Sequence, residues 1–181
     1  MAVVYNLGMD QGADWDLNVV YKQPASITNV TGNGTTVTYT AANSFSAGQT
    51  VSIDEVMPYI YNIQNVTIAT ASATQFTVTN AATGIYVSGG LATAPIDITG
   101  YTAQMQMRSS ATSPTAVLTL TTQNGGITLT GATGNIALHA TATQTGAINQ
   151  GPYDYDIELY SGASVIRVVQ GQVEVSAQVT R

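Results

Sequence analysis

Apolar and polar residues alternate through most of the stretch from Asp97 to Arg181. The alternation runs through four phrases: ITGYTAQMQMR, AVLTLTTQNGGITLTG, GNIALHATATQTGAI and GPYDYDIELYSGASVIRVVQGQVEVSAQVTR. A repeat of two residues is typical of a strand with one buried face. We therefore expect a series of short strands here, with one short turn or helix over residues 140–148.

The last of these phrases predicts a hairpin in detail. Its apolar face consists of Tyr153, Tyr155, Ile157 and Leu159, and its polar face consists of Asp154, Asp156 and Glu158. Gly162-Ala163 suits a two-residue type II′ turn, which prefers Gly at its first central position. That turn predicts the cross-strand pairs Leu159–Ile166, Glu158–Arg167 and Ile157–Val168. Beyond Gln170 the apolar residues Val173 and Val175 would fall on the opposite face of the strand. A β-bulge near Gly171 is expected because it would return them to the core face.

Charged residues are nearly missing from the middle of the chain. Between Gln23 and Ile96 the only ones are Asp54 and Glu55. Pro24 on one side, and Gly89-Gly90 through Pro95 on the other, are residues that break regular structure. The shift in composition predicts a domain of residues 26–93 inserted into a discontinuous domain of residues 1–25 and 94–181.

Both predicted domains read as β structure. In the insert, strands are expected over residues 27–31, 35–41, 49–54, 66–70 and 75–79, with a Gly-Asn-Gly hairpin turn at residues 32–34. Residues 57–62 look like a loop with exposed aromatic side chains. In the discontinuous domain, one strand face is predicted to carry Trp15, Leu17, Val19 and Tyr21. Another is predicted to carry Tyr101, Ala103, Met105 and Met107. The predicted fold class is all-β: an immunoglobulin-like β-sandwich with a second small β domain inserted after its first strand.

Composition narrows the function. Only 8% of the 181 residues are charged, against about 25% in an ordinary soluble domain. The net charge is −6, and the four basic residues are scattered, which argues against a nucleic-acid partner because such binding needs clustered cations. There is no cysteine, no apolar run of membrane-spanning length and no basic, apolar N-terminal leader. We expect no membrane partner, and assembly in a cytoplasm.

Several phrases resemble a domain family of tailed bacteriophages. Asp97-Ile-Thr-Gly-Tyr-Thr-Ala, followed by Met105, Met107 and Arg108, looks like the family's second strand, and Gln11-Gly-Ala-Asp-Trp looks like its first. Leu118-Thr-Leu-Thr-Thr, Asn124-Gly-Gly-Ile-Thr-Leu, Gly151-Pro-Tyr-Asp-Tyr-Asp and Arg167-Val-Val-Gln-Gly-Gln follow in the family's order. The family includes the N-terminal domain of the baseplate upper protein of lactococcal-type siphophages and small prophage tail-region proteins. In the insert, Asn43-Ser-Phe-Ser-Ala-Gly-Gln-Thr-Val-Ser-Ile and Thr74-Gln-Phe-Thr-Val-Thr-Asn are similar to a Thr-rich β module of cyanophage and other phage virion proteins.

This resemblance implies a non-enzymatic structural protein of the virion, in the tail, baseplate or neck. Its expected partners are other virion proteins, in a homo-oligomer or symmetric array, and no cofactor is implied. A capsid decoration (cement) protein is one alternative. The other is a carbohydrate-binding module for adhesion to a host surface glycan.

Few residues suggest chemistry. His139, the only histidine, would need a serine and a carboxylate beside it to form a triad, and we expect it to be an outward-facing strand residue. The row Asp154, Asp156 and Glu158 has members roughly 7 Å apart on a strand, which suits a solvated or interfacial face better than calcium. Asp10, Asp14 and Asp16 do not match a calcium-loop spacing. A glycosidase would need two facing carboxylates, and nothing in the sequence selects such a pair. No catalytic or metal-binding residue is assigned.

Tyr59, Tyr61 and Tyr86 are the candidate contact residues. Tyrosine is enriched at protein interfaces, so we favour a core or subunit contact for all three. The alternative is a sugar-stacking platform, because aromatic rings bind flat apolar faces well.

Overall fold

Strands dominate the computed structural model of the chain, which describes residues 2–179. The all-β prediction is confirmed. Strands are interrupted by one short helix, α1 (Ala142–Gly146), and two 3-10 turns, η1 (Tyr59–Tyr61) and η2 (Gly131–Thr133). Helix α1 lies inside the segment predicted for it, and Thr141 and Gln144 form a capping box at its start. No helix among residues 2–179 is long and apolar enough to cross a membrane.

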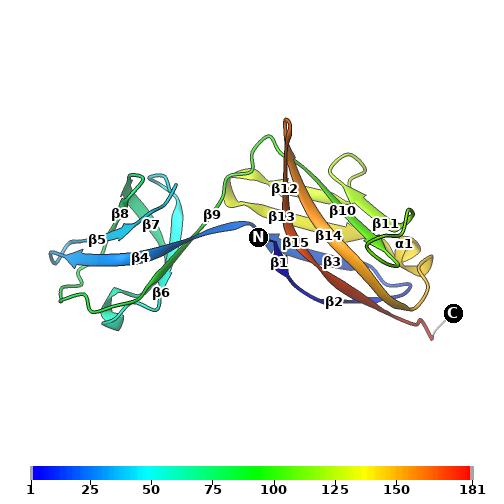
Figure 1. Cartoon of the computed structure of the whole chain (residues 1–181), viewed down its shortest axis with the longest axis horizontal. Coiled ribbons are helices and arrows are strands. Elements are labelled where there is room, and N and C mark those ends of the chain that lie inside the picture. Colours follow the sequence, from blue (N-terminus) through cyan, green and yellow to red (C-terminus); the bar gives the residue numbers. More distant parts are fainter. Residues whose placement is uncertain (1, 180–181) are drawn as a thin grey trace. The chain divides into compact units, whose positions relative to one another are not determined.

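The chain divides into two units, which are described separately (Figure 1). One unit comprises Met1–Tyr21 and Asp97–Arg181, and the other comprises Lys22–Ile96. The inserted unit is therefore longer at both ends than the predicted 26–93. Residues 22–25 and 94–95 are included because they pair with each other as neighbouring strands of the inserted unit.

The discontinuous unit contains two sheets. Its strands are β1 (Val3–Val4), β2 (Leu7–Asp10), β3 (Trp15–Val20), β10 (Thr102–Arg108), β11 (Ala116–Thr121), β12 (Ile127–Thr130), β13 (Asn135–Ala140), β14 (Gly151–Ser161) and β15 (Ser164–Ser176). The larger sheet has the order β1-β15-β14-β10-β11, with β2 also paired to β15, and the smaller one has the order β12-β13-β3. Strand β10 contacts β12, and β11 contacts β13, so the two sheets lie against each other.

Alternation decides what the two sheets bury. Met105 and Met107 on β10, and Ile157 on β14, are fully buried, as are Leu120 on β11 and Ile136 on β13. The residues between them on β10 and β14 are partly exposed polar side chains. The outer face of the six-stranded sheet is therefore polar because its inner face is apolar and the side-chain period is two.

Strands β1 and β2 were not predicted. Both pair parallel to β15: Val3 lies opposite Val169, and Leu7 lies opposite Val173. The inserted unit consequently follows β3, the third strand, and the prediction that it follows the first strand is wrong. The N-terminal strands are too short to show an alternating pattern, and only their partner β15 defines them.

The C-terminal hairpin matches its prediction except at the bulge. Gly162 and Ala163 form the turn, Leu159 pairs with Ile166, and Glu158 pairs with Arg167. Gly162 has a positive φ of 56° and Ala163 does not, in agreement with a type II′ turn. Ile157 pairs with Val169 rather than Val168, so the irregularity lies at Val168 and not near Gly171. Both Val168 and Val169 are buried there.

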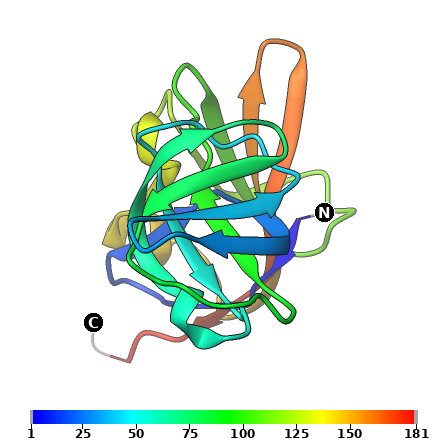
Figure 2. The same ribbon diagram turned by 90° about the vertical axis from the view of Figure 1, so that its left-hand side faces the viewer.

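The inserted unit is a closed barrel (Figure 2). Its strands are β4 (Lys22–Gly32), β5 (Thr36–Ala41), β6 (Thr50–Asp54), β7 (Ile63–Ala71), β8 (Gln75–Thr79) and β9 (Leu91–Pro95), in the order β4-β5-β8-β7-β6-β9. The predicted hairpins β4–β5 and β7–β8 are confirmed. Strand β9 was missed, because Leu-Ala-Thr-Ala-Pro reads as a breaker-rich boundary. It pairs with both β4 and β6 and closes the barrel.

Aromatic rings fill the barrel core. Tyr39 and Phe76 stack with ring centres 5.1 Å apart, and Phe45 meets Phe76 edge-on at 5.3 Å. Tyr39 and Phe76 are completely buried. The long strand β4 tolerates Pro24 because residues 22–26 pair only with β9, whereas the pairing with β5 begins at Ile27.

Candidate functional site

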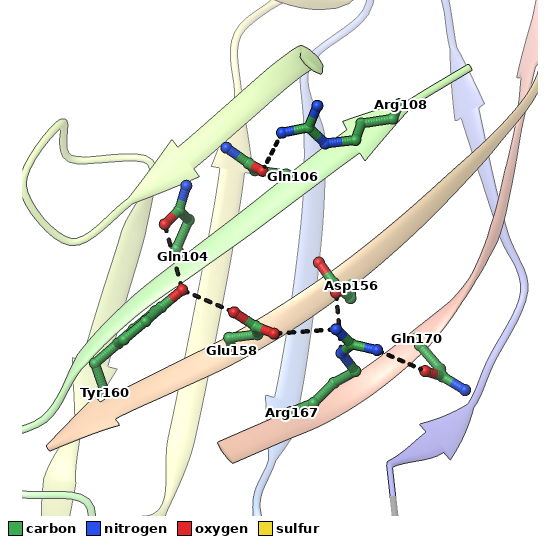
Figure 3. Close-up of polar contacts among 8 residues, drawn as sticks. All are labelled: Gln104, Gln106, Arg108, Asp156, Glu158, Tyr160, Arg167 and Gln170. Atoms are coloured by element: carbon green, nitrogen blue, oxygen red, sulfur yellow. Dashed lines mark hydrogen bonds and ion pairs between the residues drawn. The ribbon is translucent and has the colours of Figure 1, made fainter. Parts of the chain in front are cut away.

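A groove of about 740 Å³ lies on the outer face of the six-stranded sheet. Polar side chains from three adjacent strands line it: Gln106 and Arg108 from β10, Asp156 and Glu158 from β14, and Arg167 and Gln170 from β15. They project from the sheet in rows because alternate residues on β10 and β14 face outward, and the irregularity at Val168 brings both Arg167 and Gln170 to the same face of β15 (Figure 3). Asp154 lines the groove as well. The groove therefore holds two of the chain's four basic residues and three of its ten acidic ones.

Arg167 is the centre of this arrangement. Its Nε lies 3.0 Å from Asp156 Oδ2, and its Nη2 lies 3.2 Å from Glu158 Oε1. Its Nη1 donates to Gln170 Oε1 at 3.4 Å (Figure 3). The planar guanidinium thereby fixes two carboxylates and one amide on the same face of the sheet.

Glu158 extends the network to Tyr160. The Tyr160 hydroxyl donates to Glu158 Oε2 at 2.7 Å and reaches Gln104 Oε1 at 3.5 Å. The hydrogen bond to a carboxylate favours the protonated phenol, and it raises the pKa of Tyr160 to about 12.

Asp156 is the least compensated group of the groove. Burial raises the pKa of its carboxyl, and the nearby Arg167 only partly opposes that effect. Its Oδ2 atom faces Arg167, whereas its Oδ1 atom has no partner among residues 2–179. The fold therefore keeps one carboxylate oxygen in the groove without a protein donor.

Arg108 and Asp154 occupy the other end of the groove. Arg108 donates from Nη1 to the Ser113 carbonyl at 2.6 Å and from Nη2 to Gln106 Oε1 at 2.8 Å. Asp154 Oδ2 accepts from the Ala111 amide at 2.9 Å. These contacts hold the β10–β11 connection against the sheet, so that the groove has a wall as well as a floor.

The structure places the carboxylate row of Asp154, Asp156 and Glu158 beside a basic side chain. The guanidinium of Arg167 lies against Asp156 and Glu158, in the position that a cation would otherwise take. Within residues 2–179, no group of three His, Cys, Asp or Glu residues is arranged to hold a metal ion. The row is thus part of a mixed-charge network rather than a cluster of oxygen ligands.

His139 faces outward on β13, as predicted. It lies directly opposite Asp16 on β3, with Nδ1 2.8 Å from Asp16 Oδ1, and both side chains are largely exposed. In the described part of the chain this is the one hydrogen bond of the ring, so no serine completes a triad.

The other two N-terminal acids also have structural contacts. Asp14 accepts from the Ala142 amide at the start of α1, and Asp10 accepts from the Ser176 hydroxyl. Each of these carboxylates therefore stabilises a local contact of the backbone or of a neighbouring strand.

The three candidate tyrosines do not form one surface. Tyr61 is completely buried, its hydroxyl donates to the Gly84 carbonyl, and its own carbonyl accepts from Tyr39. Tyr86 is partly buried and donates to the Gly89 carbonyl. Tyr59 is 70% exposed. The prediction of a loop with exposed aromatics is correct for Tyr59 and wrong for Tyr61, because the η1 turn directs Tyr61 into the barrel.

Tyr59 instead belongs to an apolar surface that the sequence did not reveal. We define the Tyr59 patch as Met57, Tyr59, Ile60, Ile85 and Val87, all of which are exposed. The two segments are joined because the Val87 amide donates to the Met57 carbonyl, and Met57 and Ser88 form a β-bridge. Ile85 and Val87 lie in a segment without strand periodicity, which gave no signal of a surface.

Comparison of the chain with protein-family models found no match, and neither did comparison with curated proteins. The geometry of the groove and of the Tyr59 patch is therefore the basis for the functional assignment.

Proposed function

We propose that the chain is a non-enzymatic structural protein of a tailed-phage particle. Its place would be the tail, baseplate or neck, where it packs against neighbouring virion subunits. The observation that supports this best is the Tyr59 patch. Large apolar side chains exposed together on a soluble protein are typical of a protein contact surface, and those of the patch have exposed fractions between 40% and 87%.

A closed barrel is suited to carrying such a surface. Because its strands pair all the way round, it presents no free strand edge that would associate without selectivity. Contacts must then be made through side chains, and the Tyr59 patch supplies them. The only acids of the inserted unit, Asp54 and Glu55, are exposed and come shortly before Met57 in the sequence.

For the discontinuous unit we propose an immunoglobulin-like sandwich, with the barrel inserted as a second small domain. Two facing sheets and the predominance of antiparallel pairs support that assignment. The non-enzymatic assignment is supported by the local structural partners of Asp10, Asp14 and His139. The sugar platform of three tyrosines loses its support, because Tyr61 is in the barrel core.

Location in the particle tests the proposal. Cryo-EM of purified particles should show the chain in a fixed copy number at the tail, baseplate or neck, with the Tyr59 patch against another subunit. Density at the capsid surface would favour the decoration protein instead. Absence of the chain from particles that contain all their other structural proteins would refute a virion role.

A matched pair of variants tests the patch itself. Tyr59→Ser with Ile85→Ser removes apolar area from the patch, whereas Val117→Ser with Val165→Ser removes exposed apolar area from the other unit. We expect the first variant to enter particles in a lower copy number and the second to enter normally. Equal incorporation of both would refute the patch as the contact surface.

A further inference from the structure

We propose that the groove on the six-stranded sheet binds a neutral, hydroxyl-rich ligand of the oligosaccharide class. This inference goes beyond the structural role and does not depend on it. It is independent of the tyrosines of the inserted barrel, because every residue that lines the groove belongs to the discontinuous unit.

The groove combines charges of both signs, so an ion finds no site there that is lined by the opposite charge alone. An anion that approached Arg108 or Arg167 would meet the carboxylates beside them, and a cation that approached Asp156 would meet the guanidiniums. A hydroxyl group is neutral and can both donate and accept a hydrogen bond. It can donate to a carboxylate and accept from a guanidinium or amide in the same place.

The internal network leaves one set of hydrogen-bonding groups for a ligand. In Gln106 and Gln170 the carbonyl oxygen already accepts, from Arg108 and Arg167 respectively. These donors orient each amide, so that its NH₂ group is the part without a partner among residues 2–179 (Figure 3). Two oriented amide donors therefore lie on the outer face of the sheet, on the strands β10 and β15 that flank β14.

Asp156 supplies the matching acceptor. Its Oδ1 atom points away from Arg167 in Figure 3 and has no partner in the described chain. Burial of this carboxyl raises its pKa, so its charged form is less well solvated than in water and would be stabilised by a further donor. A ligand hydroxyl that donates to Oδ1 would provide one, and a second hydroxyl on the same ring would reach the amides.

The space suits more than one sugar ring. The groove of about 740 Å³ is within the range of small-molecule sites. A smaller hollow of about 270 Å³ contains Gln104 and Tyr160, and Tyr160 is joined to the groove through Glu158. Tyr160 is partly exposed beside that hollow, and an aromatic ring is a side chain on which a sugar ring can pack.

The test is a chemical-shift titration of the whole isotope-labelled chain. The probes are neutral trisaccharides of glucose, mannose, galactose, rhamnose and N-acetylglucosamine, with acetate and guanidinium as ionic probes. We expect at least one saccharide to shift the signals of Gln106, Asp156, Arg167 and Gln170 in a saturable way. No saturable shift from any saccharide, or shifts confined to the barrel, would overturn the proposal. Saturable shifts from guanidinium alone would overturn it in favour of a site for a basic side chain of a partner protein.

Two groove variants and one control complete the experiment. Asp156→Asn keeps the shape and removes the charged acceptor. Gln170→Ala removes one amide donor together with its hydrogen bond from Arg167, and it leaves the ion pairs of Arg167 with Asp156 and Glu158 in place. Because a hydrogen bond to a charged group is among the stronger ones, Asp156→Asn should weaken saccharide binding about tenfold. Asp16→Asn makes the same change on the smaller sheet and should leave binding unchanged.

The stability of the variants separates recognition from a purely structural role. We expect Asp156→Asn to keep the wild-type unfolding midpoint or raise it, while it weakens binding. If saccharide binding is unaffected by both groove variants, the groove is not the site.

Discussion

Glu158 on β14 lies directly opposite Arg167 on β15, with Arg167 Nη2 3.2 Å from Glu158 Oε1. The second oxygen of the same carboxylate accepts the Tyr160 hydroxyl at 2.7 Å. One carboxylate thus connects the hairpin partner β15 to a residue on its own strand. This link fixes the outer face of the hairpin, where the candidate groove lies.

The Glu158–Tyr160 contact predicts a change in phenol ionisation. Glu158→Gln should lower the pKa of Tyr160 from about 12 towards its ordinary value of 10.0, because the carboxylate that holds the proton is lost. NMR titration of the ring signals measures it. Tyr155, whose pKa is raised to about 12 mainly by burial, is the control and should not change. An unchanged Tyr160 would contradict the hydrogen bond.

Asp156 predicts the sign of a pH effect on stability. Its folded pKa is raised above the ordinary 3.8, mainly by burial. Between those two values the folded chain holds the proton more tightly than the unfolded chain, so the free energy of unfolding falls as the pH rises through that window. Asp156→Asn should remove this contribution and keep or raise stability above the window. Urea unfolding across that pH range measures it, and a variant that is less stable at neutral pH would contradict the prediction.

Truncation of Tyr61 should destabilise the protein far more than truncation of Tyr59. Tyr61→Ala empties part of the barrel core and removes the hydrogen bond to the Gly84 carbonyl. It should lower the free energy of unfolding by about 3–5 kcal/mol, as other large aromatic truncations do. Tyr59→Ala, at an exposed position, should change it by less than about 0.5 kcal/mol. Chemical denaturation of both variants gives the comparison, and similar losses would contradict the assignment of Tyr61 alone to the core.

The inserted barrel should be removable. Its first and last strands pair with each other, with Lys22 opposite Pro95, so the chain enters and leaves the barrel at neighbouring positions. Replacement of residues 22–96 by Gly-Asn-Gly should leave a folded discontinuous unit, because a short turn is enough to join its two segments. Cooperative thermal unfolding is the measurement. Loss of cooperativity would show that the discontinuous unit requires the barrel.

His139 should be dispensable. Its contact with Asp16 is an exposed pair, and exposed pairs contribute about 0–1 kcal/mol. His139→Ala should therefore leave both the unfolding midpoint and incorporation into particles close to wild type. Denaturation and particle composition measure the two effects, and failure of incorporation at normal protein levels would indicate a role that the structure does not suggest.

The local pattern of apolar, polar and turn residues was sufficient to predict many of the strands. The alternation in residues 153–159 predicted which side chains are buried, and Gly162-Ala163 predicted the pairs Leu159–Ile166 and Glu158–Arg167. A turn of defined length fixes the register of its hairpin, so these features depend on residues close together in the sequence. The bulge was predicted near Gly171 but lies at Val168. An extra residue at either position would return the later apolar residues to the core face, and the burial of both Val168 and Val169 is what selects Val168.

The groove depended on contacts across strands. The carboxylate row was visible in the sequence, but Arg108 and Gln106 come from β10, far from it along the chain. Nothing in the local pattern indicates that β10 lies beside β14, and the amide orientations follow from that pairing. The Tyr59 patch was hidden for the same reason, since its two segments meet through the Met57–Ser88 bridge.

By itself the sequence determined the all-β class, the faces of the longer strands and the presence of a charge-poor insert, because side-chain period, turn chemistry and composition act locally. The tertiary structure alone decided that β9 closes a barrel, that β1 and β2 extend the larger sheet, and that Tyr61 is buried whereas Tyr59 is exposed. A strand such as Leu91–Pro95 has little preference of its own. It becomes a strand because β4 and β6 offer backbone partners on both sides, and backbone groups buried in a barrel must be paired.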